Sequence, residues 1–170
     1  MDNQQIAADL FSAFETGDMD TVRQLCAPKF RARQNLNNEF DVETLIQFSQ
    51  AVSAIVKDFR YEDIIRSATN SGFVEEHTVR GTLPNGSQLT LVACVVADIE
   101  NGKITRLREY VDTAAAAGLS AALAWTSATV QAAKKSPRSH GGKLPAGSPA
   151  VQLTAPMLSS TMQCHGRKSP

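Results

Sequence analysis

Residues 72–112 read GFVEEHTVRGTLPNGSQLTLVACVVADIENGKITRLREYVD. The stretch holds three runs rich in Val, Ile, Leu and Thr, which are Gly72–Leu83, Ser87–Ile99 and Lys103–Val111. Each joint carries Asn-Gly, the strongest short-range signal for a β-hairpin. The first two runs would span roughly 40 Å each, and antiparallel strands of that length twist and curl. The stretch therefore predicts a curved antiparallel meander with a concave face.

The preceding residues alternate between helical and extended patterns. Ile6, Leu10 and Phe14 recur at helical spacing, and Gly17 suits the end of that helix. Asp18 or Asp20 can cap a short second helix, and Asp41 can begin a longer one. The predicted elements are helices Asn3–Glu15, a short one through Leu25 and Asp41–Lys57, and strands Phe30–Leu36 and Phe59–Ser67.

The composition changes abruptly after Asp112. Alanine-rich sequence from Thr113 predicts a helix with Asp112 as its N-cap. We therefore expect a domain over residues 1–119 and a helical extension over 120–135. Residues 136–170, rich in Ser, Pro, Gly and Lys, are expected to form a disordered basic tail.

The charge of the chain is polarised. The full sequence has seventeen Lys and Arg and seventeen Asp and Glu. Residues 1–112 hold all seventeen acids and eleven of the basic residues, a net charge of −6. An acidic body of this kind argues against nucleic acid as a partner.

The sequence also bears on the compartment. Met1–Gln5 lacks the basic and apolar regions of a secretory signal, and no apolar run is long enough to span a bilayer. Cys26, Cys94 and Cys164 are odd in number and form no CxxC pair. We therefore expect a cytoplasmic protein with no membrane association and no thiolate metal site.

The middle run of the meander is apolar on both faces. Leu91, Ala93 and Val95 alternate with Val92, Cys94 and Val96. An antiparallel strand normally has one face in water, so both faces of this one need cover. Helix Asp41–Lys57 can cover one face, and a second copy of the chain is expected on the other, which predicts a homodimer.

The side chains that face inward depend on the length of the two turns. A two-residue Asn85-Gly86 turn would place Glu76, Thr78 and Arg80 inside, whereas a three-residue loop would place Glu75 and His77 there. At the second joint, a turn with a glycine bulge would put Glu109 on the Ala93 face, and a tight turn would put it on the Cys94 face. Residue patterns alone leave both alternatives open.

Residues from about Asn3 to Leu119 resemble the nuclear transport factor 2-like superfamily, which includes ketosteroid isomerases, SnoaL-like polyketide cyclases and limonene epoxide hydrolases. The most specific block is Gly102-Lys103-Ile104-Thr105 followed by Arg108-Glu109-Tyr110-Val111-Asp112. The resemblance implies an α+β fold, in which a curved antiparallel sheet forms a cone with N-terminal helices packed on it (a cystatin-like α+β barrel).

The resemblance also implies site residues. Glu109 matches the acidic catalytic position, Asn35 the water-holding Asn, and Arg33 replaces the family Tyr. An Arg-x-Asp pair of the epoxide hydrolases is absent, because an ungapped match gives Glu76-His77-Thr78. The resemblance favours the register with Glu76, Thr78, Arg80 and Glu109 inside.

These residues suggest two functions. The first is a cofactor-independent acid/base enzyme acting on a small, mostly apolar polyketide- or terpenoid-like ligand, as an isomerase, cyclase, dehydratase or epoxide hydrolase. Its predicted catalytic residues are Glu109, Arg80 and Glu76. The second is a non-catalytic binding or dimerisation module of the same fold. The predicted ligand contacts are Asn35, Arg33, Thr78, Leu91, Ala93, Leu107 and Val111.

Overall fold

The computed structural model describes residues 2–125 and confirms the α+β class. Its elements, in chain order, are α1 (Asn3–Thr16), α2 (Met19–Leu25), β1 (Cys26–Gln34), α3 (Val42–Ile55), β2 (Lys57–Thr69), β3 (Gly72–Thr82), β4 (Gln88–Glu100) and β5 (Lys103–Val111). The strands form one open sheet in the order β1-β5-β4-β3-β2. The meander β2 to β5 is antiparallel as predicted, and the sheet as a whole is mixed, because β1 runs parallel to β5 at one edge.

Several helix ends fall at residues that the sequence singled out, although α3 ends at Ile55 and not at the predicted Lys57. Asp18 caps α2 by accepting a hydrogen bond from the Thr21 amide, and Asp41 caps α3 in the same way through Thr44. Gly17 ends α1 with a φ of 76°, in the left-handed region that favours glycine.

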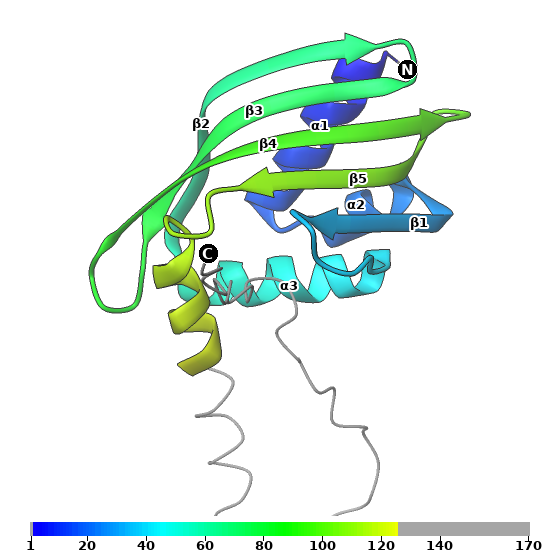
Figure 1. Ribbon diagram of the computed structural model, residues 1–170. Coiled ribbons are helices and arrows are strands. Elements are labelled where there is room, and N and C mark those ends of the chain that lie inside the picture. Colours follow the sequence, from blue (N-terminus) through cyan, green and yellow to red (C-terminus); the bar gives the residue numbers. More distant parts are fainter. Residues whose placement is uncertain (1, 126–170) are drawn as a thin grey trace, which may run out of the picture.

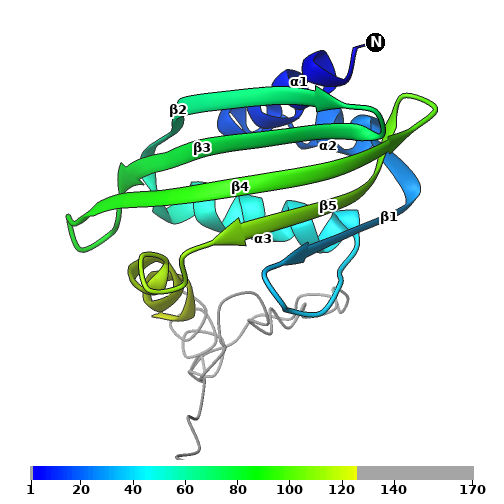
Figure 2. The ribbon, with the colours of Figure 1, turned by 45° about the horizontal axis from the view of Figure 1, so that its top comes forward.

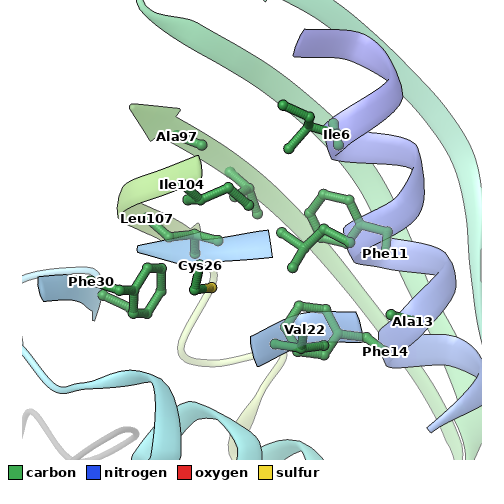
Figure 3. Packing of buried hydrophobic residues seen from close by; sticks show 14 of the residues in the cluster. Ile6, Phe11, Ala13, Phe14, Val22, Cys26, Phe30, Ala97, Ile104 and Leu107 are labelled. Atoms are coloured by element: carbon green, nitrogen blue, oxygen red, sulfur yellow. The ribbon is translucent and has the colours of Figure 1, made fainter. Parts of the chain in front are cut away.

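The helices α1, α2 and α3 lie on one side of the sheet (Figure 2). In Figure 1, α1 runs behind β2 and β3, whereas α3 lies below the opposite edge of the sheet. Figure 3 shows side chains of α1 projecting toward β1 and toward Ile104 and Leu107 of β5. The helices therefore cover the concave face and leave the convex face open.

The buried side chains form two clusters. One joins α1 and α2 to β1 and includes Phe11, Phe30 and Leu107. The other joins α3 to the far ends of β3 and β4 and includes Val52 and Leu91. Residues of both clusters line a pocket that lies between them.

The preferred register between β3 and β4 is wrong by one residue. Leu83 and Ser87 pair across a three-residue loop, in which Gly86 has a φ of 85°. This arrangement, a turn closed by a left-handed glycine, pairs His77 with Ala93 and Glu75 with Val95. The alternative register is therefore the one that forms.

The β4–β5 joint combines the two alternatives that the sequence left open. Asn101 and Gly102, with φ of 51° and 73°, form a two-residue turn that pairs Glu100 with Lys103. Such a turn alone would place Glu109 on the Cys94 face. The register shifts by one between Asp98 and Ile99, however, and Glu109 pairs with Val95 on the concave side.

The chain after β5 turns before it becomes helical. Residues 113–116 form a turn, in which the Ala114 amide donates to Asp112, and residues 117–125 are helical. Ala116 and Leu119 are buried in the second cluster. The predicted tail at 136–170 and the extension past residue 125 lie outside the described residues.

Candidate functional site

A pocket opens between the two buried clusters on the concave side of the sheet. It has a volume of about 110 Å³, smaller than the cavity of roughly 150 Å³ that holds benzene in an engineered protein. Its walls are mostly aromatic and aliphatic. The lining residues are Phe11, Phe14, Arg33, Gln34, Phe40, Leu45, Phe48, Ser49, Val52, Phe59, Tyr61, Val79, Leu91, Val95, Leu107, Glu109 and Leu119.

Glu109 is the only carboxylic acid among the described residues that line this pocket. Its side chain is directed inward by the β4–β5 register and sits among apolar walls. Burial raises the pKa of Glu109, and a hydrogen bond from Gln34 and the charge of His77 oppose that rise in part. No cation among the described residues forms an ion pair with Glu109, so its carboxylate is available to a ligand.

Gln34 holds the Glu109 side chain from the neighbouring strand. The two residues are partners in the parallel β1–β5 ladder, and Gln34 Nε2 donates a hydrogen bond to Glu109 Oε2 over 2.6 Å. Gln34 is 5% exposed. Its Oε1 is buried and, within the described part of the chain, has no hydrogen-bond partner.

Tyr61 brings a phenol to the same pocket from β2. Its ring packs against Phe11, Phe59 and His77, with ring centroids 4.5–5.4 Å apart. Burial, and then the nearby carboxylates of Glu109 and Glu75, raise the pKa of Tyr61. The phenol therefore stays protonated at neutral pH and can donate a hydrogen bond.

A buried charged cluster lies beside the pocket. Glu75 is 0% exposed and His77 is 1% exposed, and both face inward from β3. The Glu75 carboxylate accepts hydrogen bonds from Arg66 Nε and, over 3.0 Å, from His77 Nδ1. Because a carboxylate only accepts, His77 Nδ1 carries a proton.

Three predicted site residues lie on the wrong side of the sheet for the pocket. Glu76, Thr78 and Arg80 pair with Cys94, Val92 and Thr90, on the convex face. Arg80 donates there to Glu62 and to Thr90 Oγ1. The predicted acid/base set of Glu109, Arg80 and Glu76 is therefore not brought together, because the register differs by one residue.

Asn35 is engaged by the backbone rather than by the pocket. Its amide donates to the Val111 carbonyl over 3.2 Å and accepts from the Val111 amide over 3.0 Å. The φ of Asn35 is 49°, in the left-handed region. The backbone N–H of Asn35 donates a hydrogen bond to the backbone carbonyl of Glu109. Both polar ends of the side chain are occupied, so the prediction that Asn35 contacts the ligand has no support in this geometry.

The remaining predicted contacts fall into two groups. Leu91, Leu107 and Arg33 line the pocket, and the Nε atom of Arg33 is buried without a hydrogen-bond partner among residues 2–125. Ala93 is fully buried and Val111 is partly exposed. They pair with each other on the concave face without lining the pocket.

Sequence reasoning missed much of the pocket wall. Gln34 falls within the predicted strand Phe30–Leu36 and Tyr61 within the predicted strand Phe59–Ser67, but neither residue was given a role. A signal was present for Gln34: it follows Phe30 and Ala32 at alternate positions of one strand, and alternate residues of a strand point to the same face. No such local signal existed for Tyr61, because β2 carries two register shifts.

The described residues contain no cluster of three potential metal ligands. None of the helices within residues 2–125 is long and apolar enough to cross a membrane. The cysteines of this part, Cys26 and Cys94, are free, and burial raises the pKa of the Cys26 thiol to about 12.

Comparison with known families agrees with this architecture. The sequence model of the SnoaL-like domain matches residues 7–107, more than half of the chain. The chain belongs to the SnoaL-like domain family. No curated protein matched the sequence of this SnoaL-like chain.

Solved structures with the same fold include several other SnoaL-like or NTF2-like proteins. A candidate polyketide cyclase from Pseudomonas putida KT2440 has a TM-score of 0.59 and 22% identity, over 66% of this chain and 92% of its own. An NTF2-like protein from Burkholderia xenovorans LB400 has a TM-score of 0.58 and 21% identity, over 71% and 95%. An LEH-like epoxide hydrolase from M. tuberculosis has a TM-score of 0.55 and 16% identity, over 76% and 96%. At these identities the likeness establishes the fold.

Proposed function

We propose that this SnoaL-like protein is a cofactor-independent enzyme that transfers a proton on a small, mostly apolar ligand, with Glu109 as the general base. The observation that carries the proposal is a single carboxylate, with a raised pKa, in an otherwise apolar pocket. A carboxylate in water is a weak base, and burial makes it stronger by destabilising its charged form. Isomerisation, cyclisation, dehydration and epoxide opening all need such a base.

The reaction follows from the groups around Glu109. The Glu109 carboxylate takes a proton from a C–H or O–H bond of the ligand or of a water molecule, and Gln34 Nε2 keeps the carboxylate in position. Negative charge then develops on a ligand oxygen. The protonated Tyr61 phenol is one donor in the pocket that can stabilise it, and Arg33 and Ser49 also line the pocket. The neutral Glu109 acid finally returns its proton to a different atom.

The ligand contacts that we propose are Leu91, Leu107 and Arg33, together with the aromatic wall. A volume near 110 Å³, below that of a cavity that encloses benzene, holds part of a small ligand, with the rest of the ligand in the pocket opening. Polyketide- and terpenoid-like compounds, with compact hydrocarbon frames, are the class that we propose.

The alternative is a binding module without catalysis. One observation favours it: the pocket lacks a second carboxylate among the described residues, and Asn35 is occupied by Val111 rather than positioned to hold water. Such a module would bind the same kind of ligand, and its affinity would depend little on the charge of Glu109.

A generic probe separates these functions. The compound 5-nitrobenzisoxazole is a small aromatic whose ring C–H is removed by a base, which breaks the N–O bond and releases a coloured cyanonitrophenolate. The native protein should accelerate this elimination, and Glu109→Gln should remove the acceleration. Glu76→Gln is the matched control, because it removes an exposed carboxylate from the opposite face.

Each outcome of this experiment is informative. Retention of the rate in Glu109→Gln would overturn the assignment of the base. Binding of the probe by the native protein without conversion at any pH would favour the binding module. Circular dichroism of both variants confirms that the fold is intact, because Gln preserves the size of Glu.

We also propose that the protein forms a homodimer through the convex face of the sheet. Val92 and Tyr110 project from this face and are 54% and 41% exposed. Ion pairs flank them, Arg80 with Glu62 toward β2 and Arg108 with Asp98 toward the β4–β5 turn. An apolar centre with a charged rim is typical of an interface between two copies related by a twofold axis.

We propose a cytoplasmic location as well. The three scattered cysteines support a reducing compartment.

A further inference from the structure

We propose that the ligand of this pocket carries a hydroxyl group, or another hydrogen-bond donor, which Gln34 Oε1 accepts beside Glu109. The inference rests on the proposed function in that both place a small ligand in the same pocket. It adds a substrate class, namely a hydroxylated, mostly hydrocarbon molecule.

The orientation of the Gln34 side-chain amide follows from its contact with Glu109. Ionised Glu109 can only accept hydrogen bonds, so the Gln34 group that faces it over 2.6 Å is the amide nitrogen. The oxygen of the same amide therefore points elsewhere. It is buried, and no described residue donates to it.

A buried, unpaired acceptor is costly and rare in native proteins, and it needs an explanation. The described residues contain two such side-chain atoms, Gln34 Oε1 and Arg33 Nε, and both belong to residues that line the pocket. Elsewhere in the described chain, buried polar side chains such as Glu75 and His77 are satisfied. The unpaired acceptor thus belongs to a residue of the pocket wall that neighbours the proposed base.

The end of β1 is rigid, which suits recognition. Asn35, immediately after Gln34, is fixed by two side-chain hydrogen bonds to Val111 and by a backbone bond to Glu109. Gln34 is itself tied to Glu109, so its oxygen is held in place before a ligand arrives.

The position of the hydroxyl follows from the same amide. One end of the Gln34 amide touches the base and the other end receives the ligand donor. A hydroxyl bound there lies on, or next to, the ligand atom from which Glu109 removes a proton. Alcohols, enols and hydroxy ketones meet this requirement, whereas ethers, simple ketones and hydrocarbons do not.

Three small probes test the inference. Benzyl alcohol and anisole are isomers, but only the alcohol has a donor, and toluene has no polar atom. Their dissociation constants for the full chain are measured by ligand-observed NMR. The ratio of anisole to benzyl alcohol constants is compared between the native protein, Gln34→Leu and Gln34→Met. We expect the ratio to fall about fivefold in both variants, the usual worth of one hydrogen bond.

Controls separate this inference from the proposed function. Gln88→Leu, an exposed glutamine that bonds Thr82, should leave the ratio unchanged. If none of the probes binds the native protein, the pocket and the proposed function fail with the inference. If the probes bind but the ratio is unaffected by either Gln34 variant, the inference alone is overturned. A ratio that falls only in Glu109→Gln would also overturn it, because the carboxylate would then be the acceptor.

Discussion

The Glu75 carboxylate and the His77 imidazole meet over 3.0 Å at positions that are 0% and 1% exposed. They are two residues apart on one strand, so both face inward. Arg66, whose side chain is 21% exposed, reaches the same carboxylate from β2. The cluster thus connects a partly exposed cation at the sheet edge to an imidazole beside the pocket.

We predict that Glu75→Gln destabilises the protein by roughly 3–5 kcal/mol, because removal of one member leaves a buried charge without its partner. The partial exposure of Arg66 favours the lower end of that range. Urea denaturation followed by circular dichroism measures the change. Glu76→Gln, one residue along the strand on the convex face, is the control and should change stability little. Equal effects of the two substitutions would contradict the buried cluster.

We predict that His77→Gln moves the pH dependence of catalysis to higher pH. The charge of His77 lowers the pKa of Glu109, so its removal allows burial to raise that pKa further. The rate of 5-nitrobenzisoxazole elimination rises with pH as Glu109 ionises, and the midpoint of this rise is the measurement. Arg80→Gln removes a cation from the opposite face and should leave the midpoint unchanged. An unchanged midpoint in His77→Gln would show that the imidazole has only a structural role.

We predict a pH-dependent difference in stability between the native protein and Glu109→Gln. The folded pKa of Glu109 lies above the ordinary value of 4.5, so the folded state binds more protons than the unfolded state between these values. The free energy of unfolding of the native protein, relative to the variant, therefore falls as pH rises through this window. Thermal unfolding at a series of pH values measures the difference, and a constant difference would argue that the carboxylate is well hydrated.

We predict that Asn35→Ala lowers stability but spares ligand binding. The substitution removes two hydrogen bonds to Val111 and places an alanine at a left-handed φ of 49°. Each lost bond is worth about 1 kcal/mol. Thermal unfolding should show the loss, while toluene affinity stays within about twofold. Asn35→Gly, which tolerates the φ, should lose less. Loss of binding with unchanged stability would instead restore a ligand-contact role for Asn35.

We predict that Val92→Arg yields a monomer if the convex face is the dimer interface. The side chain is 54% exposed in the single chain, so an arginine there does not disturb the fold. Across a twofold axis it would meet apolar or like-charged surface, which costs affinity. Light scattering after size exclusion gives the mass. A native protein that is already monomeric at micromolar concentration would refute the interface.

Most of the fold was predictable because it depends on local rules. The predicted strand Lys103–Val111 coincides with β5, and Asp18, Gly17 and Asp41 mark helix ends as expected. The parallel pairing of β1 with β5 was not predictable, because it joins segments about 75 residues apart, such as Gln34 and Glu109.

Which side chains face the pocket depends on the β3–β4 and β4–β5 registers, and only some of these side chains were placed correctly from the sequence. Asn-Gly appears in both joints, yet the first closes a three-residue loop and the second a two-residue turn. The two turns have the same local signal, so sequence alone could not separate them. The resemblance placed Glu109 on the correct face. The face is set by a combination that the turn patterns did not predict, because Thr105 has no partner on β4 and this extra residue offsets the tight turn. Glu76 and Arg80 had no such offset and were misplaced.

The extra residue of β5 at Thr105, which shifts the β4–β5 register, has a consequence for engineering and for aligning related sequences. A designer who lengthened the Asn101-Gly102 hairpin by one residue would have to remove one residue between Ile104 and Arg106 to keep the acid inside. Neither change is neutral alone, because each one moves every side chain from Leu107 to Val111 to the opposite face of the sheet. Insertions and deletions in these two places should therefore occur in pairs among relatives that retain the acid.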